Sequence, residues 1–382
     1  MKKNLFMVAA VALFATVSCN KENIDNNGVQ GDELSDVVFV AQAEQTKTAL
    51  GEAVGETRPV TWVSGDEITV NGVKFTTADN GAVASFTTTD TFAEADIYTA
   101  IYPASAGTSL TAVNIPAEQN GTFASAAVSV AASVNQVLGF KNVASILKFK
   151  VPSPCSTITI ESTATLAGEV NVTFDDDNNP KINSVSAASS KKITLTGSFV
   201  AGTDYYVAVL PGSHKFTIRL DGYLSKASTT AVTTKRAVIT NLQTLPELET
   251  FSWGMVGQHQ GWNITAPTPM YKVSDKVYGK LNIKLQSNGF KFAKSGLQNW
   301  NTSNTHFGAW RDSGSGYFNF STEMSVGDWY SVYTNNLGGD SQNIGVSDFN
   351  KSYDVYVKII QDADWGQELG YTVVEHGTAV AF

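Results

Sequence analysis

The sequence YGKLNIKLQSNGFKF, which spans residues 278–292, alternates apolar and polar side chains on both sides of an Asn-Gly pair. Successive side chains of a β-strand point to opposite faces, so Leu281, Ile283 and Leu285 are expected to share one face. The Asn-Gly pair favours a turn. The chain then returns as Phe-Lys-Phe, with both aromatic rings on one face and Lys291 on the other. This pattern predicts antiparallel β-structure with one buried face.

Similar short runs separated by turn residues recur from Asp36 to Pro246, and no long stretch has the periodicity of a helix. Residues 67–75, EITVNGVKF, again read as a strand, an Asn-Gly turn and a strand. A β-sandwich takes about 100 residues, so this region predicts two sandwiches in tandem, at 36–140 and 141–246.

Residues 244–250 contain a proline and predict a short hinge. After the hinge, residues 251–382 predict a third sandwich, because alternating runs continue to the end of the chain. The expected fold class is therefore all-β, with three tandem antiparallel β-sandwich domains.

Tryptophan is concentrated in the predicted third domain. The chain has seven tryptophans, and those after residue 250 are Trp253, Trp262, Trp300, Trp310, Trp329 and Trp365. Interleaved Trp, Asn and Lys favour a binding surface, with carbohydrate as the leading hypothesis. An exposed indole can cover the apolar C–H face of a sugar while Lys and Asn bond its hydroxyls.

The alternative is that these tryptophans are core residues, since Trp is amphipathic and is rarely fully buried. A structural role is the better interpretation for Trp253, Trp329 and Trp365. Binding is the better interpretation for Trp262 and Trp300, each of which lies beside asparagine. The two interpretations are balanced for Trp310.

Charge and cysteine content exclude several classes of function. The formal net charge is -9 and no basic stripe is present, so nucleic acid is not an expected partner. Two cysteines and four scattered histidines predict neither a disulfide framework nor a Cys/His metal site. No cofactor is expected.

The first residues have the pattern of an export signal. Lys2 and Lys3 precede an apolar run from Leu5 to Val17, which is shorter than the ~20 residues that a transmembrane helix needs. The run ends in ATVSC at 15–19, which resembles the lipobox of bacterial lipoproteins. This resemblance implies a signal peptide at 1–18 and lipidation of Cys19; a plain secretory signal is the alternative.

Residues 19–35 are rich in Asn, Asp, Glu and Gly and predict a flexible tether. Lys-Glu directly after Cys19 resembles the charged signal that sends lipoproteins of the Bacteroidetes to the cell exterior. We therefore expect an outer-membrane protein, held by a lipid anchor and facing outward.

The region from 36 to 246 resembles the fimbrillin family of Bacteroidetes surface lipoproteins. The segments that carry the resemblance are KTAL at 47–50, VTW at 60–62, GDEI at 65–68, YTAIYP at 98–103, ASILKF at 144–149, LAG at 166–168 and YYVAVLPG at 205–212. The family implies two transthyretin-like sandwiches, and some members are pilins or adhesins. Those pilins are cleaved after an arginine, whereas the first arginine here is Arg58, inside the first domain. A stalk is therefore the preferred interpretation.

Residues 251–382 resemble the glycan-binding modules of SusE/SusF-type starch-utilisation lipoproteins. The matching segments are WGMVG at 253–257, GWN at 261–263, FKF at 290–292, WN at 300–301, LGGDSQNI at 337–344, YDVYV at 353–357 and YTV at 371–373. The resemblance implies that Trp262 and Trp300 stack on the sugar and that Lys291 donates hydrogen bonds. It adds Asn301 and Arg311 as further candidates. Trp310, which directly precedes Arg311, is a candidate from its sequence context.

Catalysis is not expected. A glycosidase needs two carboxylates about 5–10 Å apart across a cleft, and Asp312 is the carboxylate nearest in sequence to the candidate tryptophans. The leading hypothesis is a surface lipoprotein that binds a polysaccharide or oligosaccharide without cleaving it, alongside other surface glycan-uptake or fimbrial proteins. The alternative is a fimbrial or pilus-associated subunit or adhesin with a protein partner.

Overall fold

The computed structural model describes residues 33–34, 37–43, 61–300, 306–307, 318–319, 327–333, 343–363 and 366–382. The described chain is mostly β-strand, which confirms the predicted class at that level. Its helical segments are short: η1 (Ala104–Ala106), η2 (Leu110–Ala112), α1 (Phe123–Ala126) and η3 (Gln258–Gln260). Within the described residues, no helix is long and apolar enough to span a bilayer.

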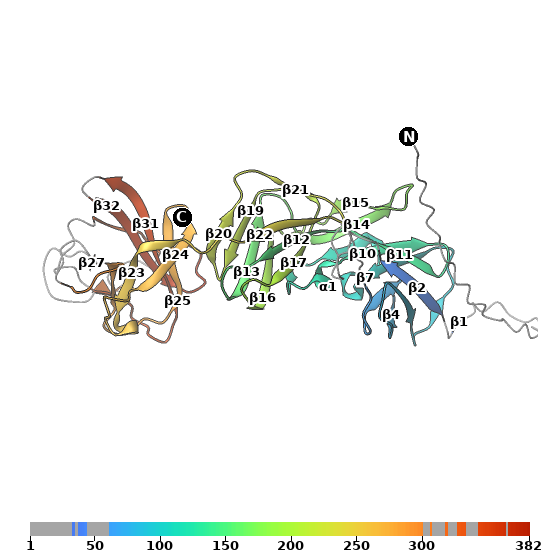
Figure 1. Cartoon of the computed structure of the whole chain (residues 1–382), viewed down its shortest axis with the longest axis horizontal. Helices are drawn as coiled ribbons and strands as arrows, with labels where there is room; N and C mark the ends of the chain where they lie inside the picture. Colours follow the sequence, from blue (N-terminus) through green and yellow to red (C-terminus); the bar gives the residue numbers. More distant parts are fainter. Residues whose placement is uncertain are drawn as a thin grey trace, which may run out of the picture.

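The sheets form an elongated row (Figure 1), with a barrel at one end, a middle group of sheets, and the C-terminal sheet at the other end. The barrel strands, in spatial order, are β10 (Ser129–Ser133), β11 (Val137–Asn142), β2 (Val38–Ala43), β5 (Val83–Thr87), β4 (Val73–Thr77), β3 (Glu67–Val70) and β7 (Tyr98–Tyr102). A two-stranded sheet joins β1 (Glu33–Leu34) to β6 (Phe92–Ala93).

The predicted hairpin at 67–75 is confirmed, since β3 pairs with β4 across Asn71 and Gly72, both at positive φ. The prediction of an open sandwich at 36–140 was wrong, because the strands of this region form a closed barrel. Strand β10 pairs with both β7 and β11, so the sheet closes on itself. Trp62 fills this barrel, with its indole N–H 3.0 Å from the carbonyl oxygen of Ala41.

The middle part contains four sheets. Their strands, each sheet in spatial order, are β20 (Tyr223–Ala227), β19 (Phe216–Leu220), β13 (Cys155–Ser162), β16 (Lys192–Phe199) and β9 (Glu118–Gln119); β17 (Asp204–Val209), β12 (Ser145–Lys150) and β22 (Ile239–Thr244); β15 (Pro180–Val185), β14 (Gly168–Phe174) and β8 (Val113–Ile115); and β18 (Gly212–His214) with β21 (Val232–Thr234).

Contacts cross the predicted boundary between residues 140 and 141. Strand β11 runs through it, and β8 and β9 pair with β14 and β16 of the middle part. Val170 and Ala208 belong to the same buried cluster as the barrel interior. The pairings β2–β11, β12–β22 and β9–β16 are parallel. The prediction that all sheets are antiparallel was therefore wrong.

The C-terminal sheet contains most of the remaining strands. In spatial order they are β28 (Phe318–Asn319), β30 (Ile344–Gly345), β26 (Phe290–Lys294), β23 (Thr250–Gly257), β24 (Thr268–Ser274), β25 (Val277–Ile283), β31 (Tyr353–Ala363), β32 (Gly366–Glu375) and β29 (Tyr330–Tyr333), with β27 (His306–Phe307) beside β26.

The strands predicted from 278–292 exist, but they do not form a hairpin. Strand β25 pairs with β24 and β31, while β26 pairs with β23, β27 and β30. The expected shared face is also interrupted, because Asn282 has φ +52° and the register shifts there. As a result, Ile283 joins the main core of the sheet while Leu281 packs toward the middle part.

The predicted hinge at 244–250 is packed against its neighbours. Leu245 is buried in the core of the middle part, and the hydroxyl of Ser225 donates to the carbonyl oxygen of Pro246. The carboxylate of Glu249 pairs with Lys272 at 2.8 Å. The link between the middle part and the C-terminal sheet is therefore restrained at several points.

Candidate functional site

The candidate site lies on the face of β23 and β26 opposite the main core. Val256 and Lys291 are direct cross-strand partners, so they share one face of the sheet. Ala293, two residues further along β26, lies on this same face. Phe290 and Phe292 are buried on the opposite face, so the predicted outward direction of Lys291 is confirmed.

A small apolar cluster covers this face. Val256, Ala293 and Ile264 are buried in it, and Trp262, Leu297 and Trp300 are partly buried against them. The ring centroids of Trp262 and Trp300 lie 6.2 Å apart, with 57° between the ring planes. The two tryptophans that were predicted to bind therefore meet over the strand face that carries Lys291.

The backbone before Trp262 fixes the position of its ring. After η3, Gly261 and Trp262 both adopt positive φ, at +74° and +59°. A left-handed conformation costs a non-glycine residue on the order of 1–3 kcal/mol. The Trp262 amide donates to the carbonyl oxygen of Gly257 at 2.9 Å, which holds this conformation.

Side-chain hydrogen bonds brace the same loop. The amide group of Gln260 bonds Asn263 on both sides, accepting from its backbone N–H at 2.6 Å and donating to its carbonyl oxygen at 2.8 Å. The side chain of Asn263 accepts in turn from Thr265. Asn263, which the sequence placed beside a stacking platform, thus serves to fold the loop.

The geometry suits an amphipathic ring-shaped ligand. Two half-buried indoles, tilted by 57° to each other, place apolar ring surface beside polar groups. A lysine on the same face can donate hydrogen bonds to hydroxyl groups. Side chains of these two kinds can contact the C–H faces and the hydroxyls of one ligand together.

His259, which precedes the loop, is not among the residues predicted for the site. Its Nε2 lies 3.0 Å from the hydroxyl of Thr268, and its Nδ1 is buried without a hydrogen-bond partner in the described part of the chain. Burial, together with the nearby charge of Lys280, lowers the pKa of His259 to about 4, so the ring is neutral at pH 7. The signal in the sequence was weak, because a lone histidine in a glycine-containing loop has no recognisable spacing.

The other tryptophans lie elsewhere. Trp253 is buried in the main core of the C-terminal sheet. Trp329 packs where that sheet meets the middle part, with the Lys358 ammonium 5.6 Å from its ring. The candidates Asn301, Trp310 and Arg311, together with Trp365 and the lipidation candidate Cys19, lie outside the described residues.

Among the described residues, no group of three or more His, Cys, Asp or Glu side chains is arranged to hold a metal ion. Comparison with models of known protein families and with curated proteins finds no match for the chain.

Proposed function

We propose that the chain is a cell-surface lipoprotein of the outer membrane that binds a polysaccharide or oligosaccharide without cleaving it. Trp262 and Trp300 stack on the sugar rings, and Lys291 donates to the hydroxyls. The observation that carries the proposal is the contact between the two indoles above the face of β26 that bears Lys291.

Within this proposal, lipidated Cys19 anchors the chain, and three β domains follow the tether. The first two, fimbrillin-like in sequence, form a stalk. The third is the SusE/SusF-like module. The elongated row in Figure 1 supports this arrangement, because the C-terminal sheet lies at the end opposite the barrel and its anchor-proximal strands.

Affinity electrophoresis tests the binding proposal. The full chain is run in native gels that contain starch, dextran, xylan or mucin glycans, beside a Trp262→Ala/Trp300→Ala variant. A Phe349→Ala variant, which removes an exposed aromatic ring outside the indole cluster, is the matched control. Retardation in one gel that only the double variant loses supports the proposal; a folded chain that no gel retards contradicts it.

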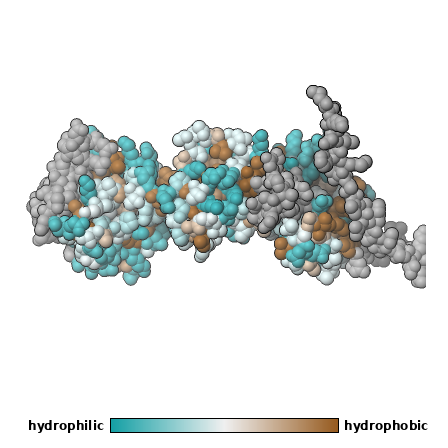
Figure 2. Space-filling view, in the orientation of Figure 1, coloured by the Kyte–Doolittle hydropathy of each residue, from teal (hydrophilic) through white to brown (hydrophobic). Residues whose placement is uncertain are grey.

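A second candidate function is a fimbrial or adhesive subunit with a protein partner. Val38, Val83 and Val137 are exposed on the adjacent barrel strands β2, β5 and β11. Figure 2 shows hydrophobic residues gathered on the barrel part of the visible face. Exposed apolar patches are typical of protein contacts. Loss of partner or self-association in a Val83→Lys/Val137→Lys variant, measured by light scattering, would favour this function.

A further inference from the structure

A cleft of about 630 Å³ lies where the middle part meets the C-terminal sheet, away from the indole pair. Its lining comes from four places in the chain: the start of β13, the turn between β19 and β20, the end of β25, and the chain after β32. Small-molecule sites typically measure about 300–1,000 Å³, so the cleft has room for two or three sugar rings.

The walls of the cleft are fixed relative to each other. The Tyr223 hydroxyl accepts from the Leu281 amide at 2.9 Å, and Arg219 donates to the carbonyl oxygen of Val273. Tyr223 also packs edge-on against Tyr271, with ring centroids 5.2 Å apart. A cleft that is braced from both sides is preorganised for a ligand.

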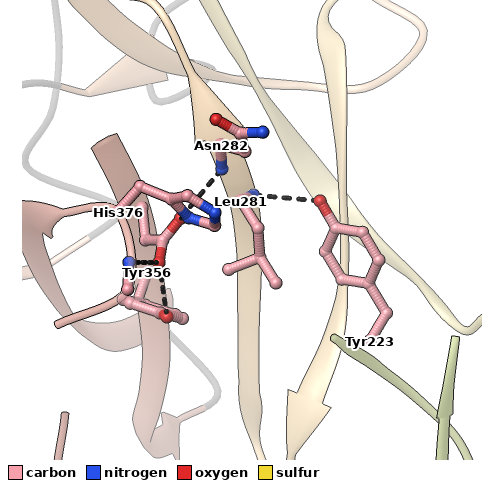
Figure 3. Close-up of polar contacts among 7 residues, drawn as sticks. Tyr223, Leu281, Asn282, Tyr356 and His376 are labelled. Carbon is pink, nitrogen blue, oxygen red and sulfur yellow. Dashed lines mark hydrogen bonds and ion pairs between the residues drawn. The ribbon is translucent and has the colours of Figure 1, made fainter. Parts of the chain in front are cut away.

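One wall holds an oriented histidine. The buried carboxylate of Asp354 accepts from His376 Nδ1 at 2.7 Å and from the Asn282 amide at 2.8 Å. Figure 3 shows the His376 ring nitrogen that is not bonded to the carboxylate turned toward the side of Leu281 and Tyr223. Bonding of one ring nitrogen to a carboxylate fixes the orientation of the imidazole and leaves the other nitrogen for a ligand.

Further polar groups around the cleft have bonding capacity left. Thr159 is 9% exposed, and its hydroxyl has no hydrogen-bond partner among the described residues. The side-chain amide of Asn282 also has no hydrogen-bond partner among the described residues. The backbone of Asn282 has φ of +52°, which is a strained conformation. Residues kept in such conformations cluster at binding sites.

The acidic groups of the cleft are already engaged. One oxygen of Asp221 accepts from the backbone N–H groups of Ser156 and Thr157, at 2.9 and 2.8 Å. The carboxylate of Asp354 already accepts hydrogen bonds from His376 and from the backbone amide of Asn282. The groups left for a ligand are hydroxyl, amide and imidazole groups and the ammonium group of Lys280, beside the apolar surfaces of Tyr223 and Leu281. Several hydroxyl and amide groups that border apolar surface match the hydroxyls and C–H faces of a sugar, and the single lysine can donate to the same hydroxyls.

We infer that this cleft is a second saccharide site, which takes a neutral oligosaccharide of two or three rings through Thr159, Asn282 and His376. It is separate from the indole site of the proposed function and does not depend on it. A chain with both sites would contact one polysaccharide at two places, which raises the avidity without changing either site.

The test uses the imidazole carbon–proton NMR signals of the full chain. The chain has four histidines, so His376 is assigned by the signal that a His376→Gln variant loses. Maltotriose, isomaltotriose and xylotriose are titrated separately at constant pH. At least one should shift the His376 signal in a saturable manner, and the shift should persist in the Trp262→Ala/Trp300→Ala variant.

Matched variants keep the test specific. Thr159→Val preserves the side-chain shape, and Asn282→Gly removes the amide while tolerating positive φ. Each should weaken the interaction at least tenfold, whereas Thr217→Val, on β19 outside the cleft, should not. The inference is overturned if no trisaccharide shifts the NMR signal of His376, or if the shift is lost in the Trp262→Ala/Trp300→Ala variant. It is also overturned if sulfate shifts this signal and the sugars do not.

Discussion

Trp262 and Trp300 come from different loops of the C-terminal sheet, yet their ring centroids lie 6.2 Å apart above the buried side chains of Val256 and Ala293. The two ring planes are tilted by 57° to each other. Lys291 lies on the same face, opposite Val256. This relationship is the basis of the proposal that Trp262 and Trp300 bind a sugar.

The strained conformation of Trp262 predicts a difference between two truncations. Both Trp262→Gly and Trp262→Ala remove the indole, but only glycine adopts φ of +59° without strain. The glycine variant should therefore be more stable than the alanine variant by about 1 kcal/mol. Urea unfolding of the two variants measures the difference; equal midpoints would mean that the loop relaxes when the ring is removed.

Lys291→Met tests the hydrogen-bonding role of the ammonium group. The substitution keeps an unbranched side chain and removes the charge, so glycan affinity should fall about tenfold, because a hydrogen bond from a charged donor contributes about 1.5 kcal/mol. Lys294→Met, at the exposed end of the same strand, is the control. Titration calorimetry with the retarding glycan compares the two, and an equal loss in both variants would point to a general charge effect.

His259 predicts a pH dependence of stability. Its pKa is lowered to about 4 in the folded chain, mainly by burial, whereas its ordinary value is near 6.5. The unfolded state therefore binds more protons between these values, so the contribution of His259 is complete above about pH 6.5 and is lost as the pH falls toward 4. The full difference between the two pKa values corresponds to about 3.4 kcal/mol, and solvent screening of the partly exposed ring reduces the expected loss to about 2–3 kcal/mol.

Urea unfolding of the wild type and of His259→Gln at pH 7 and pH 4.5 checks this prediction. Other groups titrate in the same range, so the relevant quantity is the difference between the two proteins. The variant should lose less stability on acidification than the wild type does. Parallel losses would show that the His259 ring charges without penalty in the folded chain.

The turn at Gly222 contacts Leu281 of the C-terminal sheet, so a substitution of Gly222 should weaken this contact. The φ of Gly222 is +86°, and an added Cβ would lie 2.7 Å from Cδ1 of Leu281. Gly222→Ala should therefore strain the turn and loosen the Leu281 contact, at a cost of about 1–2 kcal/mol. Hydrogen exchange should become faster at the Leu281 amide, which donates to Tyr223, while the barrel amides near Trp62 remain unchanged. If the Leu281 amide exchanges at the same rate in the variant and in the wild type, this turn does not hold the C-terminal sheet.

Local features of the fold could be predicted from the sequence. The Asn71-Gly72 hairpin and the outward direction of Lys291 depend on a few neighbouring residues, and both are confirmed. The order of strands depends on distant pairings instead. Closure of the barrel through β10 and the separation of β25 from β26 could not be deduced from alternation alone.

The candidate site shows the same division. The asparagine neighbours of Trp262 and Trp300 favoured a binding role, but only the folded chain brings the two rings together. The positive φ of Asn282, the unpartnered Nδ1 of His259 and the contact between His376 and Asp354 all depend on tertiary packing. Single residues of these types have no pattern in the sequence that would single them out.

The most direct test of the central claim is the indole N–H spectrum of the full chain during titration with maltohexaose, isomaltohexaose, xylohexaose and mucin O-glycans. Seven tryptophans give seven indole signals, which single Trp→Phe variants assign. The account predicts that one of these glycans shifts the signals of Trp262 and Trp300, while those of the buried Trp62 and Trp253 stay in place. If every glycan leaves Trp262 and Trp300 unshifted, the claim that these two rings bind carbohydrate is wrong.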